Sequence, residues 1–263
     1  MTAVEQWATS LADWAIPQHI LDQAPSSPWG HDTARFAVDD TLDRSVRSAE
    51  VARAVLPATG GSVLDVGCGG GRAAMSLVPP AERVIGVDEN PSMLAAFTEA
   101  AASVGARSMT IQGRWPDVAD DTPVADVVTC HHVAYNVADI DPFLRALTRH
   151  ARLAVVMVLP RSHPRSAWSA AWKHFWDLDR PTRPTSDDFA AVLAELGLDA
   201  ERWEMPRPPL AHAATDPERE VNSAMRVLCL GDDRRDDVAA FLADHEPDWA
   251  AVHSVFRWPG DAA

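Results

Sequence analysis

Short apolar runs alternate with helical stretches over the middle of the chain. The runs predicted as buried β-strands are 63–66, 83–87, 108–112, 126–130 and 153–159. The stretches predicted as helices between them are 72–78, 91–104 and 141–148. The clearest is 91–104, because Pro91 suits a first helical turn and Gly105 follows the end. Strands separated by helices predict a parallel sheet with helices on both faces and a ligand at the C-terminal strand ends.

The same patterns predict additions before this alternation. Residues 3–16 place tryptophan, leucine and tryptophan on one helical face, at spacings of four and three. Prolines make 17–32 irregular, and a second helix is predicted over 39–56. We therefore expect residues 1–57 to form a helical segment that serves as a lid.

Residues 161–185 interrupt the alternation after the fifth strand. This insertion is locally basic and carries four large aromatic residues: Trp168, Trp172, Phe175 and Trp176. The helices predicted beyond it are 186–196, 216–230 and 234–244, and the strands are 202–205 and 253–258. These last two strands bring the predicted sheet to seven.

The charge of the chain disfavours some partners. The 263 residues carry a formal net charge of −15 at pH 7, so nucleic acids and anionic membrane surfaces would repel the protein. Cys68, Cys130 and Cys229 form neither a disulfide framework nor a zinc-binding spacing. The sequence contains no pattern typical of a signal peptide or a membrane-spanning run, and we expect a cytoplasmic protein.

Four glycines, at positions 67, 69, 70 and 71, follow the first predicted strand. Glycine serves tight turns, and it also lets the backbone approach a nucleotide where a helix begins. Asp88 ends the next strand, where a carboxylate accepts hydrogen bonds from both ribose hydroxyls of a nucleoside. An aspartate there also serves as a helix cap, for Asn90 or Ser92. The two features in this order of elements predict a nucleoside site.

Neighbouring residues indicate which nucleoside the site favours. Arg72 stands where a dinucleotide-binding loop has glycine or alanine. Asp65, at the mouth of the loop, would repel a pyrophosphate but suits a cationic ammonium or sulfonium group. Lys173 is the only lysine, so a Walker-type phosphate loop is excluded. An NAD-dependent oxidoreductase is therefore kept only as an alternative.

Four segments resemble the motifs of class I S-adenosylmethionine-dependent methyltransferases. VLDVGCGGGR resembles the first motif and VIGVDEN the second. IQGRWPD is similar to the adenine-contacting segment, and DVVTCHHVAYNVADIDPFLRAL to the fourth strand, its loop and the next helix. The resemblance covers 63–160 and implies a Rossmann-like α/β fold over 58–263, with S-adenosylmethionine as cofactor. Elsewhere the chain has only a broad likeness to uncharacterised actinobacterial methyltransferase-like proteins.

The resemblance also implies which residues contact the cofactor. These are Asp65, Gly67, Cys68, Gly69, Asp88, Glu89, Arg114, Trp115 and Cys130. The loop residues would line the methionine end, while Asp88 would hold the ribose and Glu89 would lie beside the adenine. Cys130 would face the cofactor from the end of the fourth strand. Arg114 and Trp115 stand where the family has an acidic and a small residue, so Trp115 either stacks on the adenine or belongs to the core.

Candidate catalytic residues follow the fourth predicted strand. Methyl transfer is an in-line displacement that needs an aligned nucleophile and the exclusion of water. We expect a base for an oxygen nucleophile among His131, His132 and Tyr135, with His132 preferred. The alternative role of a histidine ring there is a hydrogen bond to the backbone. We expect no metal site, because helix capping accounts for Asp139 and Asp141.

The acceptor site is expected in the additions to the sheet. Tryptophans at 7, 14, 29, 168, 172 and 176 suit a flat aromatic or sugar ligand, although such a stripe is more often core. Arg161, His163, Arg165 and Lys173 favour an anionic acceptor, and the alternative is a solvated basic face. We expect methyl transfer to an oxygen of a small molecule. The alternatives are N- or C-methylation and binding of the cofactor or its product without catalysis.

Overall fold

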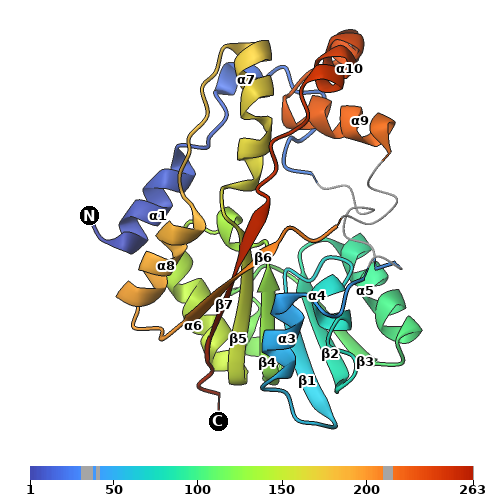
Figure 1. The fold of residues 1–263 in the computed structure, drawn as a ribbon, viewed down its shortest axis with the longest axis vertical. Helices are drawn as coiled ribbons and strands as arrows, with labels where there is room; N and C mark the ends of the chain where they lie inside the picture. Colours follow the sequence, from blue (N-terminus) through green and yellow to red (C-terminus); the bar gives the residue numbers. More distant parts are fainter. Residues whose placement is uncertain (31–37, 40–41, 210–215, 263) are drawn as a thin grey trace.

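The computed structural model describes residues 1–30, 38–39, 42–209 and 216–262. Its centre is a seven-stranded sheet in the order β3-β2-β1-β4-β5-β7-β6, shown in Figure 1. The strands are β1 (Gly61–Val66), β2 (Ala81–Asp88), β3 (Arg107–Gln112), β4 (Ala125–His131), β5 (Ala151–Pro160), β6 (Glu201–Pro206) and β7 (Val252–Pro259). Strand β7 is antiparallel to β5 and β6, and the other neighbours are parallel. The predicted mostly parallel sheet is thus confirmed.

Helices cover both faces of the sheet, because its central strands are apolar on both sides. One face carries α1 (Ala3–Ala12), α6 (Ile140–His150) and α8 (Ser186–Glu195), and the other carries α3 (Arg47–Arg53), α4 (Arg72–Met75) and α5 (Pro91–Ser103). Strand β1 is buried at all six of its positions. Alternation along β4 sends Val128 and Cys130 into the core under α6, and Val127 into the core under α3 and α5.

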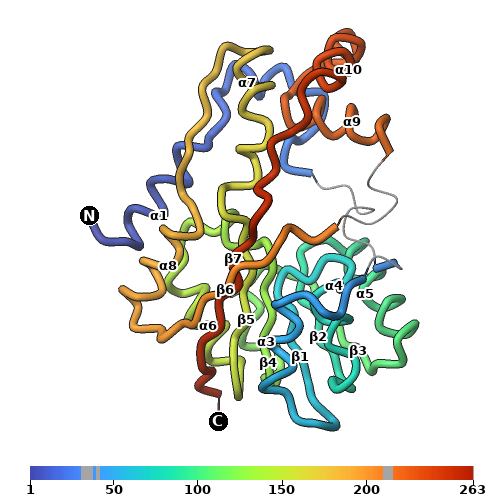
Figure 2. Tube along the Cα trace, viewed as in Figure 1, coloured from blue at the N-terminus to red at the C-terminus, as the bar shows by residue number. Residues whose placement is uncertain are grey.

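A third core lies outside the sheet, in a group of helices that we call the helical lobe. The lobe comprises α2 (Gln18–Leu21), η4 (Pro164–Trp168), α7 (Ser169–Trp176), α9 (Pro217–Val227) and α10 (Arg235–Asp244). Figure 2 shows these parts, distant in sequence, standing together above the C-terminal ends of the parallel strands. The lobe therefore joins the N-terminal segment and the predicted insertion to helices that come just before β7.

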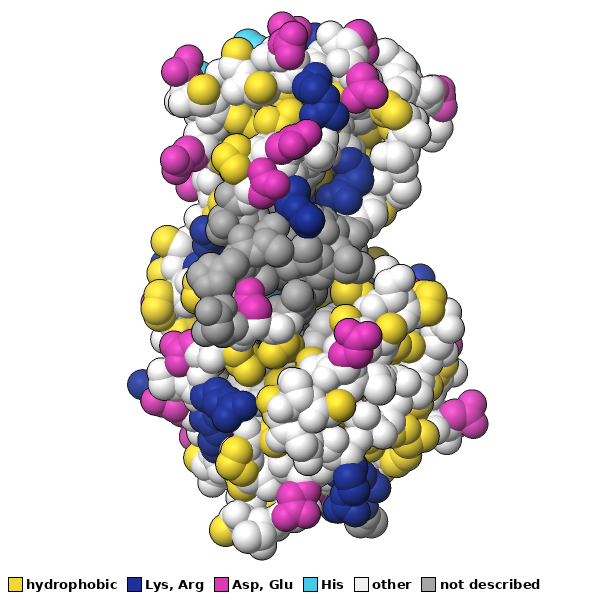
Figure 3. Space-filling model, turned by 90° about the vertical axis from the view of Figure 1, so that its right-hand side faces the viewer, with side chains coloured by type: hydrophobic (Ala, Val, Ile, Leu, Met, Phe, Trp, Pro, Cys, Tyr) yellow, Lys and Arg dark blue, Asp and Glu magenta, His cyan; other side chains and the backbone are white. Residues whose placement is uncertain are grey.

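The outline of the molecule narrows between the helical lobe and the sheet, as Figure 3 shows. Remaining short 3₁₀ turns are η2 (Ala119–Asp121), η3 (Ala134–Asn136) and η6 (Asp232–Arg234). No helix within the described parts of the chain is long and apolar enough to cross a membrane.

The helix predicted over 39–56 is shorter in the structure. It begins at Arg47, and residues 40–41 of the prediction lie outside the described residues. Asp39 is not helical, and its carboxylate pairs with Arg72 at 3.2 Å. This ion pair holds the segment before α3 next to the start of α4, a long-range contact that local periodicity does not report. The helix predicted over 3–16 also ends early, at Ala12.

Candidate active site

The glycine loop joins β1 to α4 at the C-terminal edge of the sheet. Gly67 and Gly71 have φ angles of 67° and 94°, which side chains rarely tolerate. The amides of Gly67 and Cys68 donate to the carbonyl oxygen of Val87 at 2.8 and 3.1 Å. A Cβ at Gly67 would lie 2.3 Å from Cγ2 of Val133. The glycines therefore shape the turn and also let the loop after β4 approach the loop after β1.

Asp65 lies behind this loop and is 1% exposed. Its Oδ1 accepts a hydrogen bond from the hydroxyl of Thr129 at 2.9 Å, and its Oδ2 accepts one from the amide of Ala74 at 3.3 Å. Burial raises the pKa of Asp65 to about 7, although these hydrogen bonds oppose the rise and the charge of Asp88 adds to it. Through these hydrogen bonds the Asp65 carboxylate links β4 and α4 to β1. Because Asp65 lies behind the glycine loop, its charge would act on a bound cation across the backbone of that loop.

Asp88 ends β2 beside the glycine loop. Its Oδ2 accepts from the amide of Gly69 at 3.0 Å, and its Oδ1 accepts from the amide of Asn90 at 2.9 Å. An ionised carboxylate has about four acceptor positions, so two are left for ribose hydroxyls. The cap of α5 is Asn90, whose side chain accepts from the amide of Ser92 at 2.9 Å. Local hydrogen bonding and ribose binding are therefore compatible at Asp88.

Arg114 and Glu89 are exposed near the ends of β3 and β2, whereas Trp115 is buried. The Trp115 indole donates to the carbonyl oxygen of Phe143 at 3.4 Å, and its ring meets the edge of His150 with centroids 4.8 Å apart. Since Trp115 belongs to the core under α6, its packing supports the core alternative rather than stacking on an adenine.

Cys130, expected from the resemblance to face the cofactor, is buried at the end of β4. Cys130 is 0% exposed, because strand alternation turns its side chain into the core under α6. Cys68 is also buried, with its sulfur packed over Gly86. Burial raises the pKa of both thiols, so neither is a reactive thiolate.

Three histidines meet at the same edge of the sheet. His131 ends β4, His132 follows it, and His253 comes from the start of β7. The ring centroids of His132 and His253 are 5.0 Å apart, and those of His131 and His132 are 6.3 Å apart. Nε2 of His131 and Nδ1 of His253 are buried and have no hydrogen-bond partner among the described residues. Burial lowers the pKa of His131, His132 and His253 to about 3, 4 and 3, so all three are neutral at pH 7.

His132 is exposed just after the end of β4, although protein packed around its ring affects its pKa. Its side chain is exposed, yet burial is what lowers its pKa, as expected for a ring that water reaches but protein surrounds. Its φ is 64°, a left-handed conformation uncommon for residues other than glycine, asparagine, aspartate and histidine. The amide of His132 donates to the carbonyl oxygen of Val158 at 2.8 Å, which holds this conformation.

Sequence reasoning missed His253. It lies 122 positions after His131, and only the antiparallel return of β7 beside β5 pairs it with Pro160. The single available signal was a histidine at the start of the last predicted strand.

Tyr135, the third candidate for a base, makes structural contacts at the loop after β4. Tyr135 is 4% exposed, and its hydroxyl donates to the carbonyl oxygen of Pro160 at 2.9 Å. Its ring stacks on Trp7, with centroids 5.5 Å apart. Burial raises the pKa of Tyr135 above its usual range, so its hydroxyl is protonated and holds the loop after β4 through Pro160.

Most of the tryptophans pack inside the protein. Trp7 donates to the carbonyl oxygen of Val137 at 2.9 Å, and Trp14 stacks on His163 with centroids 4.0 Å apart. Buried Trp168 and Trp172, with the partly buried Trp176, belong to the core of the helical lobe. Trp29 differs, because it is 48% exposed.

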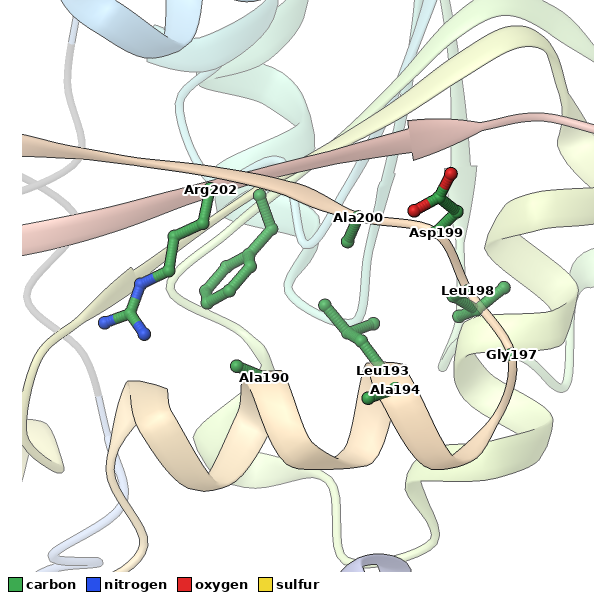
Figure 4. A pocket seen from close by; sticks show the side chains of 9 residues that line it. Ala190, Leu193, Ala194, Gly197, Leu198, Asp199, Ala200 and Arg202 are labelled. Carbon is green, nitrogen blue, oxygen red and sulfur yellow. The ribbon is translucent and has the colours of Figure 1, made fainter.

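A shallow groove of about 410 Å³ lies between α8 and β6. Figure 4 shows Ala190 and Leu193 facing the strand, with Arg202 on the opposite wall. This groove lies at the N-terminal end of β6, whereas His253 pairs with Met205 at the other end. It is therefore separate from the site at the strand ends. Within the described ranges, no group of three or more His, Cys, Asp or Glu side chains is arranged to hold a metal ion.

Residues 63–153 match the family model described as "Methyltransferase domain". A ubiquinone biosynthesis O-methyltransferase of Azorhizobium caulinodans is 35% identical over 94 residues, 36% of this chain and 37% of that protein. A carboxy-S-adenosyl-L-methionine synthase of Wolinella succinogenes is 34% identical over 121 residues, 41% of this chain and 48% of that protein. The aligned parts cover less than two thirds of either relative.

Solved structures show the same fold. A cyclopropane-fatty-acyl-phospholipid synthase-like protein from Lactobacillus casei has a TM-score of 0.54 at 16% identity, covering 92% of this chain and 98% of that one. Three features agree with one family: the motif region, the order of the strands, and the placement of the glycine loop and Asp88. Residues 63–153 therefore form a methyltransferase domain of the S-adenosylmethionine-dependent type.

Proposed function

We propose that the protein transfers a methyl group from S-adenosylmethionine to an oxygen atom of a small molecule. One observation carries this proposal: Asp88, the glycine loop and the neutral histidines line one edge of the sheet, at the ends of β2, β1 and β4 and the start of β7. The O-methyltransferase named among the relatives supports oxygen as the nucleophile.

The residues around the glycine loop fit the cofactor. The backbone of Gly67 and Gly69 would lie against its methionine end, and Asp88 would accept hydrogen bonds from its ribose. Glu89 and Arg114, both exposed, would lie beside its adenine. When bound, the cofactor supplies an electrophilic methyl carbon on a sulfonium, which a nucleophile must approach in line.

His132 would orient the acceptor and take its proton. A neutral imidazole can accept a hydrogen bond from a hydroxyl, and the lowered pKa of His132, about 4, keeps the ring neutral near pH 7. His253 and His131 lie around it and are neutral as well. The unpartnered nitrogens of His131 and His253 offer further positions for the hydroxyl or for a bound water. Neutral rings avoid repulsion of the cationic cofactor.

Calorimetric titration with S-adenosylmethionine, S-adenosylhomocysteine and NAD tests the cofactor assignment. Binding of the first two without NAD supports it, and binding of NAD alone would overturn it. Turnover is then followed as S-adenosylhomocysteine formed from a panel of phenols, sugars and hydroxy acids. Cofactor binding without turnover of any acceptor would favour the non-catalytic alternative.

The variant His132→Asn tests the base. Asparagine tolerates the left-handed backbone of this position, so the loop should be retained. We expect turnover to fall by about 100-fold or more, with cofactor affinity within about twofold of wild type. His19→Asn, at an exposed position of α2, is the matched control. Full turnover in His132→Asn would remove His132 from the mechanism.

A further inference from the structure

Three arginines of the helical lobe lie near one another, and they have no acidic partner among the described residues. Arg165 comes from η4, Arg180 from the segment after α7, and Arg226 from α9. Each has a buried guanidinium nitrogen with no hydrogen-bond partner among the described residues: Nη1 of Arg165, Nε of Arg180 and Nε of Arg226. The guanidinium groups of Arg165 and Arg180 donate to backbone carbonyl oxygens, Arg165 to Pro28 and Arg180 to Trp14 and Ala15. We call these three residues the arginine cluster.

The charge of the arginine cluster is not compensated by the protein around it. Burial, together with the charges of Arg180 and Arg226, lowers the pKa of Arg165 to about 10, and no carboxylate of the described residues acts on it. Arg165 is still charged at pH 7. The contrast with the rest of the chain is clear, because Arg202 pairs with Asp187 at 2.6 Å and Arg234 with Asp237 at 2.8 Å. A chain with 38 acidic residues places none beside this cluster within its described parts.

The arginine cluster adjoins the acceptor side of the proposed active site. The amide of Arg165 donates to Nδ1 of His163 at 3.2 Å, and the ring of His163 meets Tyr135, with centroids 5.2 Å apart. Tyr135 belongs to the loop that carries His132. The guanidinium of Arg165 also lies 3.9 Å from the ring centroid of the half-exposed Trp29.

Other basic residues of the insertion behave differently. Lys173 is half exposed and pairs with Asp177 at 2.9 Å and Asp179 at 3.0 Å. Arg161 is exposed. A solvated basic face accounts for these two, but it does not account for unpartnered nitrogens that water does not reach. An unpaired buried charge is costly and is retained where something else pairs with it.

We propose that the arginine cluster binds an anionic group of the methyl acceptor, a carboxylate or a phosphate. A guanidinium presents a planar fork of donors that matches both oxyanions. The anion would satisfy Nη1 of Arg165 and would anchor the acceptor with its hydroxyl toward His132. This assignment of the ligand as the acceptor rests on the proposed methyl transfer, whereas the oxyanion site itself does not.

Binding of simple oxyanions tests the proposal directly. Sodium phosphate and sodium benzoate are titrated into the full chain at constant ionic strength, followed by calorimetry and by thermal unfolding. Arg165→Gln and Arg226→Gln remove one guanidinium each. Arg149→Gln, at an exposed position of α6, makes the same change in net charge away from the cluster. Affinity for S-adenosylmethionine is measured on every variant, so that a failure of the cofactor site is recorded separately.

We expect at least one oxyanion to bind wild type and Arg149→Gln, and to bind both cluster variants about tenfold or more weakly. The stronger probe distinguishes a phosphate site from a carboxylate site. No binding of either probe to wild type, or equal binding to the cluster variants, would overturn the proposal even where S-adenosylmethionine binds normally.

Discussion

A single buried carboxylate, Asp65, couples the charge of a ligand to the protonation of the protein. Its pKa of about 7 means that it is partly protonated in the free protein at neutral pH. A cationic ammonium or sulfonium group near the glycine loop favours the ionised form of the carboxylate. Ligand binding and proton release are therefore linked at this residue.

We expect S-adenosylmethionine to release about half a proton on binding at pH 7, and to bind more tightly as the pH rises through 7. Calorimetry in two buffers with different ionisation enthalpies measures this release. Asp65→Asn should remove it, and S-adenosylhomocysteine, which lacks the sulfonium charge, should release less. If Asp65→Asn released the same fraction of a proton on binding S-adenosylmethionine, the proton would come from another group.

Asp88 gives the second prediction at the scale of the residue. Asp88→Ala removes the acceptor proposed for the ribose hydroxyls and also the partner of the Gly69 amide. We expect binding of S-adenosylmethionine to weaken by about 1.5–3 kcal/mol, the range for hydrogen bonds to a charged group. Asp120→Ala, exposed in η2, makes the same charge change and should leave the affinity unaltered. Affinity of Asp88→Ala within about twofold of wild type would exclude the ribose contact.

At the scale of elements, the sequence predicts the sheet well for a physical reason. A strand covered on both faces is a continuous apolar run, and β1 and the centre of β5 show such runs in the sequence and such burial in the structure. The glycine loop is predictable too, because its positive φ angles require glycine locally. Both signals are carried within a few residues.

The direction of a side chain after a strand end is not predictable in this way. The alternation of side chains along β4 turns Cys130 into the core. The left-handed backbone of His132 then ends this alternation, and the turn that follows buries Tyr135. His253 and the helices α9 and α10 reach the site region through antiparallel pairing and lobe packing, which connect distant segments. The arginine cluster likewise combines three segments with no shared local pattern.

The contact between the glycine loop and the loop after β4 gives a test at this scale. In Gly67→Ala the alanine must adopt a left-handed backbone, and its Cβ overlaps Cγ2 of Val133. In Gly105→Ala the backbone is similarly left-handed, with a φ of 74°, but no atom lies within 4 Å of the new Cβ. Each substitution should cost about 1–2 kcal/mol for the backbone. Gly67→Ala should cost about 1–3 kcal/mol more for the overlap.

Urea unfolding of the two variants measures these costs. Adding Val133→Ala to Gly67→Ala should recover much of the extra loss, and a double-mutant cycle isolates the coupling between the two positions. Equal losses of stability for Gly67→Ala and Gly105→Ala would show that the two loops do not need the close approach.

At the scale of the whole molecule, neutral buried histidines set the response of the fold to acid. Burial lowers the pKa of His131, His163 and His253 to about 3 in the folded protein. In the unfolded chain each has a pKa near 6.5, so the unfolded state binds more protons between about pH 6.5 and pH 3. Stability is therefore lost as the pH falls through this range. Asp65 acts in the opposite direction, because its raised pKa favours folding below about pH 7.

The balance of these groups predicts acid unfolding above pH 3. Near pH 5, three histidines gain a proton on unfolding and Asp65 loses one, a net uptake of about two protons and a slope of about 2.7 kcal/mol per pH unit. His132 is left out because water reaches its ring. At this slope a total stability of about 5 kcal/mol is lost at about pH 4.7, and one of about 10 kcal/mol at about pH 3. His253→Gln should reduce the slope by about one proton, whereas the exposed His19→Gln should leave it unchanged. Circular dichroism against pH, with urea unfolding at several pH values, measures both quantities. If His253→Gln leaves the dependence of stability on pH unchanged, the ring of His253 has the same pKa in the folded and unfolded chain. The site around His132 would then be open to water rather than enclosed by the lobe.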